Sequence, residues 1–168
     1  MIGKLLRHVR VAGGHRSPFA GSDFAAPDDI TVTSTAFGDG DDTSPQLSWT
    51  GLPPQTRQVV LIIDDIDVPL PRPLLHTVAV IEPGVQNVDT GALQPGAAGM
   101  RFIPGSLGHH GYAGPRPIPG HGPHRYRFRV FALDEQIPDH LSTAKALLKQ
   151  MAGHVLARGV LTGTYERQ

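Results

Sequence analysis

Side chains that could bind an anion or transfer a proton occur at three places in the sequence, each beside an apolar segment. An acidic stretch follows an apolar run, a single histidine interrupts a second apolar segment, and a histidine and a tyrosine open a third. These residues are Asp64, Asp65, Asp67, His76, His124 and Tyr126. Carboxylates accept hydrogen bonds, whereas imidazoles and phenols both donate and accept them. The set therefore suits a polar ligand or acid–base chemistry.

Each of the three places also has a purely structural interpretation. The acids stand where the chain leaves a buried strand, and they would serve equally well as solvated turn residues. His76 stands alone in an apolar strand, where a carboxylate partner would fix its tautomer and raise its pKa. His124 and Tyr126 are two residues apart and would share one face of a strand. They would either cap that strand or face a bound anion.

Enzymatic and metal-binding alternatives use the same residues. Asp65, His76 and His124 would supply general acid–base groups to a hydrolase, although no activated nucleophile is evident. The spacing of His121 and His124 would suit zinc, together with His76 and Asp65. The sequence has no cysteine, which excludes disulfides, thiolate catalysis and cysteine-based zinc sites. We assign no catalytic residue and expect neither a metal nor a cofactor.

The apolar pattern predicts the strands that hold these residues. Residues 59–63 form a continuous apolar run bounded by charge, which is typical of a strand buried on both faces. Residues 74–81 form a second, largely apolar segment. Residues 125–134 predict a third strand, in which Phe128 and Val130 alternate with Arg127, Arg129 and Phe131. Shorter strands are expected at residues 30–34 and around Trp49. Turns rich in glycine and proline separate them, which favours antiparallel pairing.

The remaining segments differ from these strands. Residues 84–123 hold ten glycines and six prolines, which predicts a long irregular connection of the kind that is usually functional or mobile. A helix is expected near the C-terminus from apolar residues at helical spacing, namely Leu141, Ala144, Leu147, Leu148, Met151 and Val155. Its capping signals are Pro138, Asp139 and Ser142. A short final strand follows, so the predicted class is mainly β, antiparallel, with a helix near the C-terminus.

Length and charge limit the class of protein. The 168 residues fit one domain, which we place at residues 28–168, after an N-terminal extension at 1–27 that is either a short amphipathic helix or loose. Fifteen basic and fifteen acidic residues give a net charge of +0, which argues against nucleic-acid binding. No apolar run reaches the roughly 18 residues of a transmembrane segment. A signal peptide is not recognisable, and the cytoplasm is the expected location.

Two motifs that occur in order carry a family resemblance. Gly-Tyr-x-Gly-Pro occupies residues 111–115 and Gly-Pro-His-Arg-Tyr occupies residues 122–126. They are preceded by TSPQLSWTGLP at 43–53 and by IDDIDVP at 63–69. Together with His76, this pattern resembles the phosphatidylethanolamine-binding protein (PEBP) family, and within it the bacterial branch related to Raf kinase inhibitor protein. The resemblance covers residues 28–165.

The resemblance implies a β-sandwich of two antiparallel sheets with peripheral helices and one small anion-accepting pocket. The residues that match the family's pocket are Asp65, Asp67, His76, Tyr112, Gly114, Pro115, Pro117, His124 and Tyr126. Arg125 is expected to pair with an acid of the 64–67 stretch. Ile66 and Val68 replace the proline and alanine usual in the family's acidic motif, a change at the rim of the expected pocket.

The resemblance also implies a function. A PEBP-like pocket would bind a phosphorylated small molecule or a phospholipid head group such as phosphoethanolamine. Loop N–H groups, the Tyr126 hydroxyl and a protonated His124 or His76 would donate to the phosphate, so the affinity is expected to fall as the pH rises. Regulation of a protein partner such as a kinase or protease follows by analogy, as does a homodimer. A hydrolase that uses the same Asp/His pocket is the alternative.

Overall fold

The computed structural model describes Phe24, residues 26–34 and residues 42–167. Its elements in chain order are β1 (Thr31–Thr33), β2 (Leu47–Thr50), β3 (Gln58–Asp65), β4 (Leu74–Ile81), β5 (Asn87–Val88), β6 (Met100–Ile103), β7 (His124–Leu133), α1 (Ala144–Met151) and β8 (Val155–Tyr165). The predicted 1–27 extension lies outside the described residues, apart from Phe24, Ala26 and Pro27. No helix in the described part of the chain is long and apolar enough to cross a membrane.

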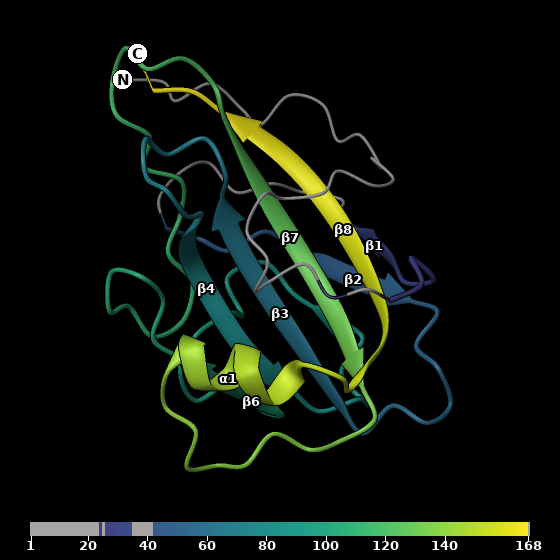
Figure 1. The fold of residues 1–168 in the computed structure, drawn as a ribbon. Coiled ribbons are helices and arrows are strands. Elements are labelled where there is room, and N and C mark those ends of the chain that lie inside the picture. Colours follow the sequence, from purple (N-terminus) through teal and green to yellow (C-terminus); the bar gives the residue numbers. More distant parts are fainter. Residues whose placement is uncertain (1–23, 25, 35–41, 168) are drawn as a thin grey trace.

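The strands form two antiparallel sheets. A five-stranded sheet has the order β6-β4-β3-β7-β8, and a three-stranded sheet has the order β1-β2-β5. Figure 1 shows α1 crossing one face of the larger sheet while β1 and β2 lie behind it. The predicted class, mainly β with a helix near the C-terminus, is therefore confirmed.

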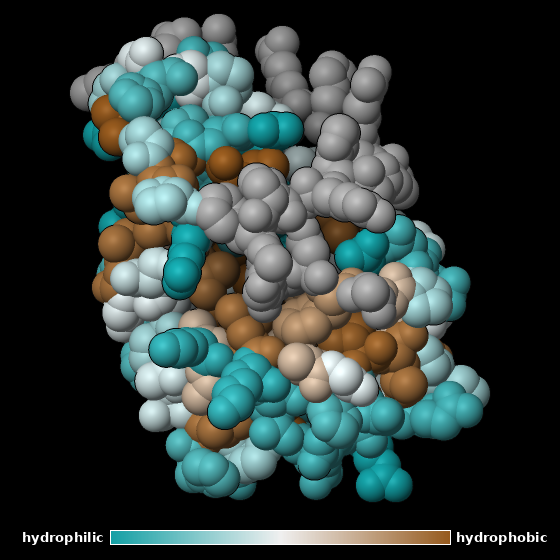
Figure 2. All heavy atoms as spheres, in the orientation of Figure 1, coloured by the Kyte–Doolittle hydropathy of each residue, from teal (hydrophilic) through white to brown (hydrophobic). Residues whose placement is uncertain are grey.

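Both faces of the five-stranded sheet are covered, and β3 contributes to both. Leu61 and Ile63 point into the core shared with the three-stranded sheet, whereas Val60 and Ile62 point into the core under α1. This confirms the prediction that the run at 59–63 is buried on both faces. Figure 2 shows hydrophobic side chains gathered in the middle of the face that carries α1, with hydrophilic residues around its rim.

The C-terminal helix is shorter than predicted. Thr143 is its N-cap, with Oγ1 accepting from the Ala146 N–H at 3.2 Å, and the helix ends at Met151. Gly153 then adopts a positive φ of 86°, which turns the chain out of the helix. Val155 already pairs with Leu133 of β7, so the prediction that Val155 belongs to the helix was wrong. Pairing with β7 outweighs a marginal helical periodicity at this point.

The long connection predicted at residues 84–123 is not wholly irregular. It contains the short strands β5 and β6, and β6 pairs with β4 through Val78 and Ile103 among others. Both strands are too short to show an alternating pattern in the sequence. Strand β6, for example, has only four residues between Gly99 and Pro104. From Pro104 to Pro123 the chain has no strand or helix, and this loop borders the candidate site.

Candidate functional site

The end of β3 places two neighbouring aspartates on opposite faces of the five-stranded sheet. Side chains alternate along a strand, so Asp65 shares a face with Ile63 and Asp64 does not. Asp65 lies directly opposite Tyr126 of β7, and His124 precedes Tyr126 by two residues on the same face. The strand pairing thus gathers three predicted site residues, all buried, on the face that looks toward the three-stranded sheet.

A β-bulge brings His76 into this group. Simple alternation along β4 would put His76 on the same face as Val78 and Val80, under α1. The register of β3 against β4 shifts between Ile63 and Asp64, and the pairs change from Ile63–Thr77 to Asp64–Leu75. His76 is the extra residue of this bulge, a feature that re-aims a side chain. Its ring meets the Tyr126 ring edge-on, with 5.4 Å between the centroids.

His76 is held in one neutral tautomer. Its Nδ1 lies 3.1 Å from the carbonyl oxygen of Ala113, and since a carbonyl only accepts, Nδ1 carries the proton. Burial lowers the pKa of His76 below its usual 6.5, against the opposing effects of the Ala113 carbonyl and the Asp65 charge. The lowered pKa favours the neutral ring, so the expectation that His76 donates to an anion as a cation stays a prediction that this shift disfavours. Its buried Nε2 is an acceptor that contacts no hydrogen-bonding partner among the described residues.

Asp65 and His124 form a buried pair. His124 Nδ1 donates to Asp65 Oδ2 at 2.7 Å, and both side chains are at most 3% exposed. Beside them the Tyr126 hydroxyl is buried and has no hydrogen-bonding partner within the described part of the chain. Burial, and after it the negative charge of Asp65, raises the pKa of Tyr126. The phenol consequently stays protonated at neutral pH and can donate to a ligand.

The loop between β6 and β7 closes one side of this group. The Ala113 carbonyl accepts from His76 Nδ1, and the Ala113 N–H donates to Thr77 Oγ1 at 3.3 Å. Tyr112 is half-buried, and burial raises the pKa of its phenol. Of the other predicted loop residues, Gly114 and Pro117 are buried and Pro115 is half-buried. The loop is thereby fixed to β4 at the position of the bulge.

Asp67 is placed differently from Asp65. Its two carboxylate oxygens bind Arg125, with Oδ1 2.7 Å from Nη2 and Oδ2 2.8 Å from Nε, and Oδ2 also accepts from the Arg125 N–H. The Arg125 hydrogen bonds lower the pKa of Asp67, against partial burial. The expectation that Arg125 pairs with an acid of the 64–67 stretch is confirmed. Asp67 orders the strand end, and its oxygens are already occupied.

Several contacts at the site are not evident from the sequence. Thr77 is hidden inside an apolar segment, on the same face as Ala79 and Ile81, and it meets the loop through the Ala113 N–H. Asp42 binds the Gly114 N–H at 2.9 Å and forms an ion pair with Arg116 across 74 residues of chain. No local spacing signals such a long-range pair. The described residues contain no group of three histidine or acidic side chains that could hold a metal ion.

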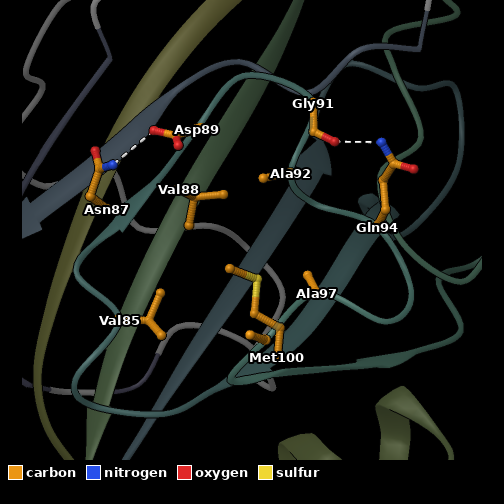
Figure 3. A pocket seen from close by; sticks show the side chains of 10 residues that line it. Val85, Asn87, Val88, Asp89, Gly91, Ala92, Gln94, Ala97 and Met100 are labelled. Carbon is orange, nitrogen blue, oxygen red and sulfur yellow. Dashed lines mark hydrogen bonds between the residues drawn. The ribbon is translucent and has the colours of Figure 1, made fainter.

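A separate cavity of about 570 Å³ lies around β5 and the turn before β6 (Figure 3). Its side chains are mainly apolar, and Asn87 binds Asp89 within it at 3.0 Å. The lining residues are Val85, Asn87, Val88, Asp89, Gly91, Ala92, Gln94, Ala97, Ala98 and Met100. It includes none of the predicted site residues, and its polar groups are engaged with one another.

Comparison with known proteins agrees with the geometry. The sequence model of the family described as phosphatidylethanolamine-binding protein matches residues 20–166. The chain belongs to the phosphatidylethanolamine-binding protein family. A PEBP fold also accounts for the two sheets and for the ordered loop beside β7. Family membership supports ligand binding in general.

Bacterial and archaeal PEBP relatives cover most of the chain. A UPF0098 protein of Aquifex aeolicus is 33% identical over 99% of both chains, and one of Pyrococcus horikoshii is 36% identical over 77% of this chain and 68% of its own. The crystal structure of a putative PEBP homologue of Chlamydia trachomatis is 32% identical with a TM-score of 0.73, and it matches 84% of this chain and 99% of its own. Escherichia coli YbcL gives 26% identity and a TM-score of 0.72, over 83% and 99%.

Proposed function

We propose that this PEBP protein binds a phosphorylated small molecule or phospholipid head group at the face formed by Asp65, His76, His124 and Tyr126. The observation that carries the proposal is the pair of buried polar atoms, Tyr126 Oη and His76 Nε2, that no described residue satisfies. A buried polar atom without a partner costs free energy in the folded protein. Two of them on one face are what a polar ligand would satisfy.

The two atoms require different partners, because one donates a hydrogen bond and the other accepts one. The Tyr126 hydroxyl donates to a phosphate oxygen, and charge-assisted hydrogen bonds of this kind are short and strong. His76 Nε2 accepts, so it fits either the P–OH of a phosphate that retains one proton or the ammonium of an ethanolamine group. Asp65 binds Nδ1 of His124, which leaves Nε2 of that ring for the ligand. A zwitterionic phosphoethanolamine group matches this mixture better than a simple anion does.

The test is a calorimetric titration of inorganic phosphate and O-phosphoethanolamine into the wild type and into His124→Ala. Removing the protein's partner of a buried, hydrogen-bonded charged group on a ligand costs about 2–5 kcal/mol of binding free energy. We therefore expect one-site binding in the wild type and a loss of at least about 30-fold in the variant. Equal binding by the two proteins would place the ligand elsewhere. Circular dichroism spectra of both would confirm that the variant is folded.

The Asp65–His124 pair also supports the hydrolase alternative. A carboxylate that orients an imidazole is the arrangement used to make histidine a general base. The alternative predicts release of inorganic phosphate from O-phosphoethanolamine, which phosphorus NMR of the titrated sample would detect. Unchanged ligand after prolonged incubation would leave binding as the activity of the site. Regulation of a kinase or protease is an analogy to the family, and it stays a prediction.

A further inference from the structure

The carboxylate of Asp42 accepts hydrogen bonds from the loop that borders the proposed site. Its Oδ1 accepts from the Gly114 N–H at 2.9 Å, and its Oδ2 pairs with the Arg116 guanidinium. Burial alone would raise the pKa of Asp42, but the hydrogen bond from Gly114 and the Arg116 guanidinium outweigh it and lower that pKa. A backbone N–H and a guanidinium converge here on an anion, and that anion belongs to the protein itself.

Gly114 leaves the space that this anion occupies. A Cβ atom at position 114 would lie 3.0 Å from Asp42 Oδ1 and 3.6 Å from the Tyr112 ring, so any other residue would crowd the carboxylate. Asp42 itself has a positive φ of 55°, and it is the one non-glycine residue with a positive φ in the described part of the chain. Such conformations persist where surrounding contacts hold them, and they gather at ligand clamps and switch regions.

The loop connects this carboxylate to the site. Ala113, next to Gly114, bonds both His76 and Thr77. Gly114 and Arg116, the next residues of the loop, contact Asp42. Residues 113–116 therefore contact the site at β4 on one side, through Ala113, and Asp42 on the other side, through Gly114 and Arg116. A ligand bound at Tyr126 would reach the second side if it carried another acidic group.

We propose that the Gly114 N–H and the Arg116 guanidinium form a second anion subsite, which we call the outer subsite, and that Asp42 occupies it until a ligand displaces its carboxylate. This inference rests on the proposed function, because the ligand's phosphate sits at Tyr126 and His76. The ligand class is a small molecule that carries a phosphate and, a few bonds away, a carboxylate. The incoming carboxylate takes over the hydrogen bonds of Asp42, so the charge of the outer subsite stays balanced.

Two ligands that differ only in that carboxylate provide the test. O-phosphoserine has the phosphate and ammonium of O-phosphoethanolamine plus one carboxylate. In the wild type the added carboxylate must compete with Asp42. Asp42→Asn tolerates the positive φ and keeps an oxygen for Gly114, but it lacks the charge that holds Arg116. We expect Asp42→Asn to gain about tenfold in affinity for O-phosphoserine relative to O-phosphoethanolamine, the value of one charge-assisted hydrogen bond.

Two further variants separate the outer subsite from a general charge effect. Asp28→Asn removes the same unit charge from an exposed pair with Arg158, at 2.7 Å, that contacts none of the site residues. It should not change the ratio of the two affinities. Asp42→Asn combined with Arg116→Gln removes both the competing carboxylate and the guanidinium that would bind the ligand's carboxylate. The double variant should therefore lose the gain in affinity for O-phosphoserine. Coupling between the two substitutions, measured as a double-mutant cycle, assigns the effect to Arg116.

The outcomes distinguish this inference from the proposed function. Selective gain for O-phosphoserine in Asp42→Asn, lost with Arg116→Gln, supports the outer subsite. An equal gain for both ligands, or no gain, overturns it while leaving the inner site intact. Failure of the wild type to bind O-phosphoethanolamine overturns the proposed function and the inference with it.

Discussion

Asp64 and Asp65 are neighbours in sequence, yet they lie in two different kinds of polar cluster. Asp64 points to the sheet face that carries α1, where its carboxylate accepts from Arg127 at 2.9 and 2.7 Å and from Arg129 at 2.7 Å. Asp65 faces the other core, where His124 is the side chain that it binds among the described residues. Beside Asp64 two guanidinium groups share one carboxylate, whereas beside Asp65 two buried polar atoms, Tyr126 Oη and His76 Nε2, have no hydrogen-bonding partner among the described residues.

The difference separates polar groups that hold the fold from polar groups that serve a ligand. The Asp64 cluster lies on the sheet face that carries α1, with side chains between 0 and 10% exposed, and its two guanidinium groups share one carboxylate. The cluster of Asp65, His76, His124 and Tyr126 sits beside a loop rich in glycine and carries unsatisfied atoms. Unsatisfied buried groups persist where function needs them. The two clusters should therefore respond oppositely to mutation.

The largest effect is expected from Asp64→Asn, which leaves the two buried guanidinium groups of Arg127 and Arg129 without a carboxylate. Breaking a buried ion pair by removing one partner costs about 3–5 kcal/mol of the free energy of unfolding. Urea unfolding followed by circular dichroism would measure it. Asp67→Asn is the matched control, because the Asp67–Arg125 pair is far more exposed and should cost about 1 kcal/mol or less. Equal losses in the two variants would contradict a structural role specific to Asp64.

A smaller effect, of opposite sign on stability and on binding, is expected from Tyr126→Phe. The variant removes a hydroxyl that makes no hydrogen bond to the described residues, so the free energy of unfolding should stay level or rise by about 1 kcal/mol. The affinity for O-phosphoethanolamine should fall about tenfold, because one hydrogen bond to a charged group is lost. Urea unfolding and calorimetry of the same sample give both values. A loss of stability would show that the hydroxyl has a partner in the folded protein.

The smallest effect concerns the pH dependence of stability. Because the pKa of His76 is lower in the folded protein than its ordinary 6.5, the unfolded chain binds more protons as the pH falls through about 6.5. His76 thus destabilises the fold below that pH, by up to about 1.4 kcal/mol per pH unit, and the loss levels off below the folded pKa. His76→Gln should remove this part of the slope. Identical slopes in the two proteins between neutral pH and about pH 5 would argue for a charged His76.

The sequence was a good guide to the long strands and a poor one to the short ones. The run at 59–63 is apolar throughout and the segment at 74–81 is largely so, which is the pattern of strands buried on both faces. Strands β5 and β6 contain two and four residues, so they exist through pairing with neighbours and leave no period. The same holds at Val155. Its spacing also fits the helix, but its pairing with Leu133 makes it part of strand β8.

For the site, the sequence supplied the residue types but not their geometry. Spacing alone put His124 and Tyr126 on one face, whereas only the structure separates Asp64 from Asp65, which belong to one acidic stretch in the sequence. It could not place His76, because a bulge in β4 reverses the face that alternation predicts. It also could not give the charge of His76, which depends on burial and on the Ala113 carbonyl. Asp42 and Arg116 stayed unnoticed because 74 residues separate them.

The most direct test of the central claim is a long-range proton–nitrogen NMR spectrum of the histidine rings, recorded at neutral pH during titration with O-phosphoethanolamine. The His76→Gln and His124→Ala variants identify the two sets of signals. We predict that His76 is neutral with its proton on Nδ1, and that its Nε2 signal and the His124 signals shift together as the ligand saturates the protein. Saturable binding that leaves both histidines unmoved, or a doubly protonated His76, would contradict the account.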